Sequence, residues 1–310
     1  MDKGKKVKYR LLSGLLRALS FLPLQVHRFL GSLAGFVMLH LVKYRRDVAL
    51  KNLRNAFPDK SSEEIDSILK KFYRYLGTIY CEAIWFGSCR GNMRRLSRAR
   101  VCDLKGQEYL NGYTDSGKSV IVLMSHTGNF ELISGFMTYV GDGTPISARE
   151  SHIAVSYKRL HNEFWNDFMY RNRLSGLLRP EEYDAQVESA DILRFVYRHK
   201  DDAYVYHFIT DQYPYGEGHN VEVDFLNART LSMTGGLAMA RKLCLPVLYL
   251  RFACRPKGGY TIEYLPFCDD ASREDIGELT QKYYTMLEED IRRQPWNYLW
   301  THKRWKSLNY

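Results

Sequence analysis

The feature that most constrains the fold is an alternation of strand-like and helix-like segments that begins near residue 101. Runs of residues typical of strands cover residues 119–124, 144–148, 203–209, 221–225, 246–252 and 260–265. Helical spacing of apolar residues covers residues 128–139, 155–173, 187–199, 232–243 and 273–293. Strands that alternate with helices are typical of layered α/β domains. We therefore expect an α/β fold over residues 101–310, with a central, mostly β-sheet core flanked by helices.

Residues 1–100 have a different character. They hold 21 Lys and Arg against seven Asp and Glu, whereas the whole chain has a formal charge of only +10. Basic sequence beside apolar sequence is typical of binding to an anionic membrane surface. Nucleic acid is the rival partner, but the chain has no zinc-finger spacing or RNP motif, so we expect no nucleic acid. We predict that residues 1–100 form a basic, helical, membrane-associating region.

The apolar part of this region is short for a membrane span. Its longest uncharged run, residues 29–42, has 14 residues, whereas a spanning helix needs about 20. We expect a pair of interfacial or shallowly inserted helices, and a buried helical hairpin of a soluble protein is the alternative. The six cysteines contain no C-x-x-C spacing, which argues against a zinc site or a secreted disulfide framework and favours a reducing compartment.

The strand-like run 119–124 ends at Ser-His-Thr-Gly-Asn-Phe-Glu, residues 125–131. Catalytic groups of α/β sheets often lie just past the carboxyl end of a strand, and a histidine there can act as general base. Glu131 could turn back beneath His126 and fix the tautomer of its ring, as the acid does in Ser-His-Asp sites. Taken alone the spacing is weak, because a histidine that only packs, or one that binds a metal, would look the same.

Resemblance to a known family makes the spacing more specific. The run from His126 to Glu131 resembles the H-x4-D/E motif of the lysophospholipid acyltransferase superfamily, in the form found in the lipid A biosynthesis acyltransferases (lauroyl/myristoyl transferases). Four further segments resemble this family in the same order, namely residues 45–58, Asp211-Gln212, residues 225–247 and residues 294–306. The resemblance covers nearly the whole chain, and five ordered segments together are far more specific than any one of them.

The resemblance implies an O-acyltransferase that moves a fatty acyl chain from acyl carrier protein, or acyl-CoA, to a hydroxyl of a lipid A precursor at the cytoplasmic face of an inner membrane. His126 would be the base and Glu131 its partner. Arg149, Asn129 and Asp211 would contact substrate, although Asp211 could equally cap the turn that follows it. We expect neither metal nor other cofactor, because the thioester donor is already activated.

The chain departs from the family pattern at three positions that leave the acceptor open. Phe130 replaces a usual Trp, Asn227 a common Gly, and Glu150 the Pro that usually follows Arg149. A lysophospholipid, an aminolipid or another glycolipid is therefore an alternative acceptor. A membrane lipid-binding protein without activity and a thioesterase are the alternatives from other classes.

Overall fold

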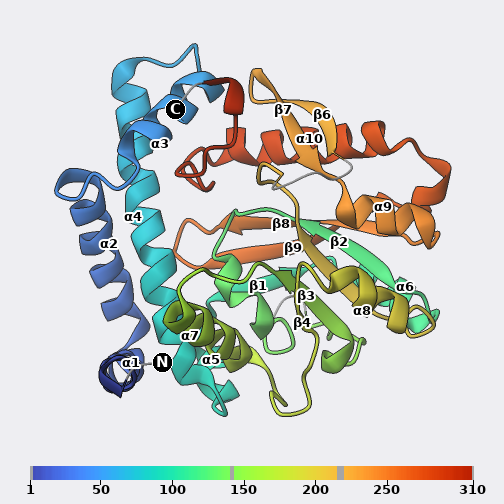
Figure 1. Ribbon diagram of the computed structural model, residues 1–310, viewed down its shortest axis with the longest axis horizontal. Coiled ribbons are helices and arrows are strands. Elements are labelled where there is room, and N and C mark those ends of the chain that lie inside the picture. Colours follow the sequence, from blue (N-terminus) through green and yellow to red (C-terminus); the bar gives the residue numbers. More distant parts are fainter. Residues whose placement is uncertain (1–2, 140–142, 215–219, 309–310) are drawn as a thin grey trace.

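Figure 1 shows the computed structural model of the protein, which describes residues 3–139, 143–214 and 220–308. A seven-stranded sheet in the order β1-β9-β8-β2-β5-β3-β4 forms its centre. The strands are β1 (Cys102–Lys105), β2 (Val120–Met124), β3 (Ile153–Tyr157), β4 (Gln186–Glu188), β5 (Val205–Ile209), β8 (Val247–Cys254) and β9 (Tyr260–Cys268). A separate antiparallel hairpin pairs β6 (Asn220–Phe225) with β7 (Ala228–Met233). The predicted α/β class with a sheet core flanked by helices is confirmed.

The described helices surround this sheet, with α10 on one side and α5 and α7 on the other in Figure 1. They are α1 (Lys3–Ser20), α2 (Leu24–His40), α3 (Arg46–Ala56), α4 (Ser62–Phe86), α5 (Met93–Ala99), α6 (Gln107–Asp115), α7 (Glu163–Arg173), α8 (Ile192–Arg198), α9 (Gly235–Lys242) and α10 (Ile276–Arg293). Short 3-10 turns join several of them, including η2 (Phe130–Gly135).

Strand β2 fixes the position of the candidate site. All five of its residues are buried, as expected of a Val-Ile-Leu run covered on both faces. It pairs in parallel with β5 and β8, and Met124 lies opposite Ile209 of β5. Because neighbouring parallel strands end at the same edge, the residues that follow β2 and β5 are brought together there.

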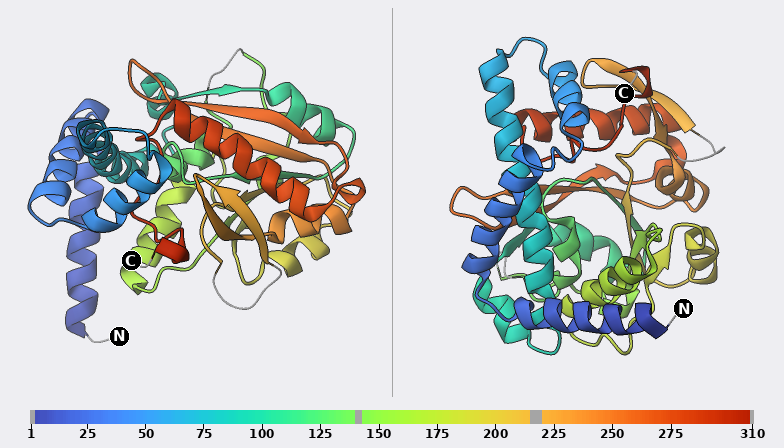
Figure 2. Two further views of the ribbon diagram at one scale, coloured as in Figure 1. Left: turned by 90° about the horizontal axis from the view of Figure 1, so that it is seen from above. Right: turned by 60° about the vertical axis from the view of Figure 1, so that its left-hand side comes forward.

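Helix α4 lies between α2 and the sheet, as both Figure 1 and Figure 2 show. The two helices approach closely at glycines. A Cβ added at Gly31 would lie 2.6 Å from the Cα of Thr78, and one at Gly35 or Gly77 would also meet backbone atoms of the facing helix. This contact leaves much of the opposite face of α2 exposed, including Phe29, Leu33 and Phe36. No helix in the described part of the chain is long and apolar enough to cross a membrane.

The element predictions fail mainly between residues 128 and 173. Residues 144–148 form no strand, and a strand lies instead at β3, which overlaps the start of the helix predicted for residues 155–173. Pairing with β5 and β4 decides this, because the strand preference of a segment depends on its tertiary neighbours. The helix predicted from Gly128 to Tyr139 is only the short turn η2.

Candidate active site

The side chain of His126 contacts Asp211 across the carboxyl ends of β2 and β5. Its Nδ1 lies 2.7 Å from Oδ1 of Asp211, and its backbone N–H donates to the same oxygen over 3.2 Å. The Asp211 side chain is 2% exposed and that of His126 is 15% exposed. Burial raises the pKa of Asp211, but the charge and hydrogen bonds of His126 outweigh it and hold that pKa below its ordinary value. Asp211 is therefore a carboxylate at neutral pH.

The second ring nitrogen of His126 faces Gln212. Nε2 of the ring lies 3.1 Å from Nε2 of Gln212. An ionised Asp211 can only accept a hydrogen bond from Nδ1, so Nδ1 carries the proton, and in the neutral ring Nε2 keeps a lone pair. That lone pair accepts the Gln212 amide in this structure, and it is available to a hydroxyl that takes the place of the amide.

The C-terminal segment, residues 294–308 after α10, supports the turn that carries Asp211 and Gln212. The backbone N–H of Tyr213 donates to Nε2 of His302 over 3.2 Å. Burial lowers the pKa of His302 to about 4, although Asp211 acts in the opposite direction. His302 is therefore neutral at pH 7, as an acceptor of this amide must be.

The loop after His126 has a conformation that requires glycine. Gly128 has a φ of +60°, and a Cβ there would lie 2.1 Å from the ring of Phe252, so both backbone strain and space exclude a larger residue. Its N–H donates to Oδ1 of Asn297 over 2.7 Å, and its carbonyl accepts from the hydroxyl of Tyr75. Helix α4 and the C-terminal segment thus hold the loop from two sides.

Among the described residues, the hydrogen-bond partner of Glu131 is Arg173 and not His126. Glu131 forms a two-pronged ion pair with Arg173 at the end of α7, with Nε and Nη2 each 2.8 Å from one carboxylate oxygen. Burial lowers the pKa of Arg173, but the charge and hydrogen bonds of Glu131 outweigh burial and raise that pKa above its usual value. The chain passes into η2 through the buried Asn129 rather than directly into a helix, and this turn directs Glu131 towards α7.

Asn129 and Arg149, two of the predicted substrate contacts, differ in burial and in position. Asn129 is completely buried, and its Nδ2 donates to Oε2 of Glu82 over 3.0 Å, so its side chain is directed into the protein. Arg149 is exposed and precedes β3, whose first residue pairs with the first residue of β5. Because β2, β5 and β3 are parallel, Arg149 lies at the edge where strands begin, whereas His126 lies where they end.

Three of the segments that resemble one family, residues 45–58, 225–247 and 294–306, meet in space. Asn52 of α3 donates to the carbonyls of Trp300 and His302, each over 2.8 Å. Trp305 donates to the carbonyl of Phe225 over 2.9 Å. Trp300 and Trp305 are fully buried, so these rings belong to the core.

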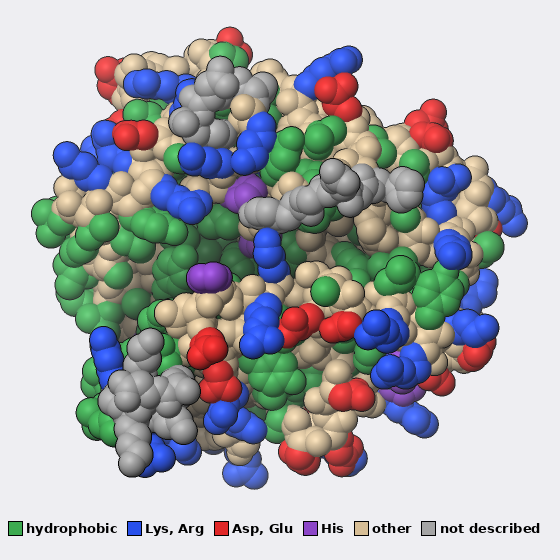
Figure 3. Space-filling view, in the orientation of Figure 1, with side chains coloured by type: hydrophobic (Ala, Val, Ile, Leu, Met, Phe, Trp, Pro, Cys, Tyr) green, Lys and Arg blue, Asp and Glu red, His purple; other side chains and the backbone are tan. Residues whose placement is uncertain are grey.

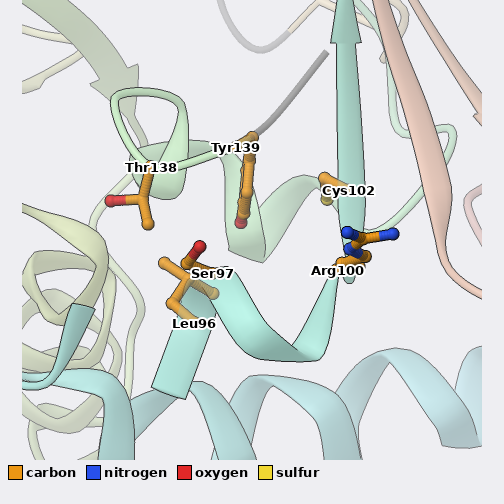
Figure 4. Close-up of a pocket in the computed structure, with 6 residues that line it drawn as sticks. All are labelled: Leu96, Ser97, Arg100, Cys102, Thr138 and Tyr139. Atoms are coloured by element: carbon orange, nitrogen blue, oxygen red, sulfur yellow. The ribbon is translucent and has the colours of Figure 1, made fainter. Parts of the chain in front are cut away.

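Figure 3 shows a hollow beside histidine side chains, where hydrophobic side chains form much of the surface and Lys and Arg side chains surround it. Two other cavities lie elsewhere. One of about 10 Å³ (Figure 4) is lined by Leu96, Ser97, Arg100, Cys102, Thr138 and Tyr139, and it holds at most one water molecule. The other, of about 490 Å³, is an open hollow along β1, α6 and β9. Within the described ranges, no three potential ligands cluster as a metal site would require.

Comparison with known proteins gives a consistent result. The sequence model of the family described as bacterial lipid A biosynthesis acyltransferase matches residues 5–307. The lipid A biosynthesis palmitoleoyltransferase of Escherichia coli (strain K12) is 26% identical over 293 residues, which are 92% of this chain and 87% of the relative. The lipid A biosynthesis acyltransferase of Shigella flexneri matches with the same identity and coverage.

Proposed function

The chain belongs to the bacterial lipid A biosynthesis acyltransferase family and is an acyltransferase, and from this premise we propose that it moves a fatty acyl chain from a thioester donor to a hydroxyl of a lipid A precursor. The observation that carries the proposed mechanism is the contact of His126 with the buried carboxylate of Asp211. Histidine held in this way can take a proton from the acceptor at its free nitrogen.

The reaction needs only one base. Nε2 of His126 takes the proton of the acceptor hydroxyl as the oxygen attacks the thioester carbonyl. Asp211 stabilises the imidazolium that forms and keeps Nδ1 protonated. When the tetrahedral intermediate collapses, the C–S bond breaks and His126 returns the proton to the leaving thiolate. The amide of Gln212, 3.1 Å from Nε2, occupies the position that the acceptor hydroxyl takes during the reaction.

Glu131 has a different task in this proposal. Its carboxylate neutralises Arg173 and fixes the guanidinium over the ring of Tyr157, 5.7 Å from the ring centroid. Because Glu131 follows η2's first residue, the ion pair also ties the end of the His126 loop to α7. Glu131 is thus a positioning residue, and Asp211 takes the role of carboxylate partner that the sequence assigned to Glu131.

The donor and acceptor are the finer parts of the proposal. The donor is acyl carrier protein or acyl-CoA, since either presents a thioester. The relatives' names specify lipid A biosynthesis, which favours a lipid A precursor over a lysophospholipid, an aminolipid or another glycolipid. A lipid-binding protein without activity is the rival from another class, and the ordered His126–Asp211 contact favours an enzyme.

The proposal is tested by comparing the lipids of a strain that lacks the gene with those of the parent strain. We expect lipid A of the deletion strain to lack one acyl chain, and the purified protein to restore it in vitro from acyl carrier protein or CoA thioesters. Unchanged lipid A together with an altered phospholipid or aminolipid would transfer the proposal to that acceptor. Thioester hydrolysis that no lipid acceptor stimulates would indicate a thioesterase.

The proposal includes an anionic membrane surface as a partner, at the cytoplasmic face of the inner membrane. In α1, Leu11 is 70% and Leu15 56% exposed, and in α2, Phe29 is 69% and Phe36 56% exposed. Lys8, Arg10 and Arg17 of α1 are exposed as well. Apolar side chains combined with basic ones are what an interfacial helix needs on an anionic bilayer.

We expect the double change Leu11→Asp and Phe29→Asp to reduce binding to phosphatidylglycerol-containing vesicles at least tenfold, since each buried large apolar side chain contributes about 1.5–3 kcal/mol. Vesicle sedimentation measures this. Leu193→Asp on α8 is the control, because Leu193 is also an exposed apolar side chain, and this variant should bind like the unchanged protein. Equal binding by the double variant and the control would exclude α1 and α2 as the membrane face.

A further inference from the structure

A buried carboxylate in α4 connects the candidate site to α2. Glu82 is 1% exposed. Its Oε2 accepts from Nδ2 of Asn129 over 3.0 Å and from the hydroxyl of Tyr260 over 2.7 Å. Its Oε1 accepts from Nε of Arg28 in α2 over 2.7 Å. The mechanism proposed above uses none of these three contacts.

A charged acceptor at the position of Glu82 differs from a neutral one in its cost and in the strength of its hydrogen bonds. A buried carboxylate is costly unless it is paired and hydrogen-bonded, and a neutral oxygen would also accept from Asn129 and Tyr260. Hydrogen bonds to an ionised acceptor are shorter and roughly twice as strong as neutral ones. The guanidinium of Arg28, whose side chain is 30% exposed, compensates the charge at the edge of the protein. Glu82 thus forms a stronger hydrogen bond with Asn129 than a neutral residue would.

Asn129 connects Glu82 to the loop that carries His126. It is three residues beyond His126 and two before Glu131. Its backbone carbonyl accepts from the N–H of Leu132 and so begins η2. Its buried Oδ1 has no hydrogen-bond partner within the described structure, so the amide is oriented through Nδ2, which donates to Glu82 and, over 3.4 Å, to the carbonyl of Ile79.

We propose that Glu82 is a positioning residue for acyl transfer, because its carboxylate, compensated by Arg28, orients Asn129 and thereby holds the loop of residues 125–131 that carries His126. The inference rests on the function proposed for His126. It also gives α2 a role in turnover, since the helix with the exposed apolar face supplies the cation that pairs with Glu82.

The test uses a pair of carboxylates with matched surroundings. Asp290 accepts from Nε of Arg251 and the hydroxyl of Tyr249, as Glu82 accepts from Arg28 and Tyr260, but no hydrogen bond in the described structure joins the Asp290 side chain to the His126 loop. Hydrogen exchange of residues 125–132 and the kinetics of acyl transfer are measured for Glu82→Gln and Asp290→Asn at matched folding, judged by melting temperature.

We expect Glu82→Gln to speed exchange in residues 125–132 and to lower kcat about tenfold with an unchanged KM for the donor, since a loss of alignment near 1 Å can cost up to about a hundredfold. Asp290→Asn should leave both properties within twofold of the unchanged protein. In an Asn129→Ala background, Glu82→Gln should have little further effect, because it acts through Asn129.

Unchanged exchange and unchanged kcat in folded Glu82→Gln would overturn the inference, and so would equal effects of Asp290→Asn. If Glu82→Gln does not fold, Arg28→Gln, which keeps a donor for Glu82, is measured in its place with the same expectations. Full turnover by a His126 variant would refute the function proposed for His126, whereas hydrogen exchange would still decide whether Glu82 positions the loop.

Discussion

Replacing His126 with asparagine is expected to lower kcat by about three orders of magnitude, within the range of 10² to 10⁴ that a positioned general base contributes. Asparagine places an amide near the position of Nδ1, so it can still donate to Asp211, but it has no basic nitrogen at the position of Nε2. The buried carboxylate therefore keeps a partner, and the variant should fold. Release of the donor thiol and formation of the acylated lipid are measured together.

The control for this variant is His199→Asn. His199 lies 3.2 Å from Asp202 at the end of α8, so it is also a histidine beside a carboxylate, but it lies at the edge where β5 begins. The activity of His199→Asn should equal that of the unchanged protein. Full acyl transfer by folded His126→Asn would refute the proposed mechanism, and it would favour a lipid-binding role or a different base.

The strand before His126 was predictable from the sequence, because a short run of apolar, β-branched residues between polar segments has few other interpretations. The sequence also contained a signal for Asp211 that the H-x4-E spacing obscured. His126 and Asp211 each stand two residues beyond the end of a strand, β2 and β5. If these strands are neighbours and parallel, both residues must lie at the same edge. The sequence alone does not show which strands are neighbours, and the partner was therefore assigned to the nearer carboxylate.

The partners of Asn129 and Glu131 depend on longer-range packing. Glu82 and Arg173 are 47 and 42 residues away from them, and local propensity contains no information about such contacts. The position of Arg149 depends on the same kind of contact, because the pattern of residues 155–173 predicts a helix where the structure has the end of β3. A helix there would have hidden that Arg149 precedes a strand parallel to β2, and thus lies at the opposite edge of the sheet from His126.

The contact of His126 with Asp211 predicts a second large effect. Asp211→Asn keeps the size of the side chain and an oxygen that can accept from the backbone N–H of His126, but it removes the charge that stabilises the imidazolium. We expect kcat to fall by about two to four orders of magnitude, as loss of the carboxylate does in Ser-His-Asp sites. The KM of the donor should change little, because Asp211 is 1% exposed and lies behind the ring.

Glu131→Gln separates this role from the one that the H-x4-E spacing suggested. Glutamine cannot neutralise Arg173, so the ion pair at 2.8 Å is lost and some activity should be lost with it. If Glu131 acts through Arg173, then Arg173→Gln should have the same effect, and the double variant should be no worse than either single one. Asp211→Asn should instead multiply the loss in each background, because it acts on the base itself. The opposite pattern, with Asp211→Asn near full activity and Glu131→Gln inactive independently of Arg173, would mean that Glu131 replaces Asp211 at His126 during turnover.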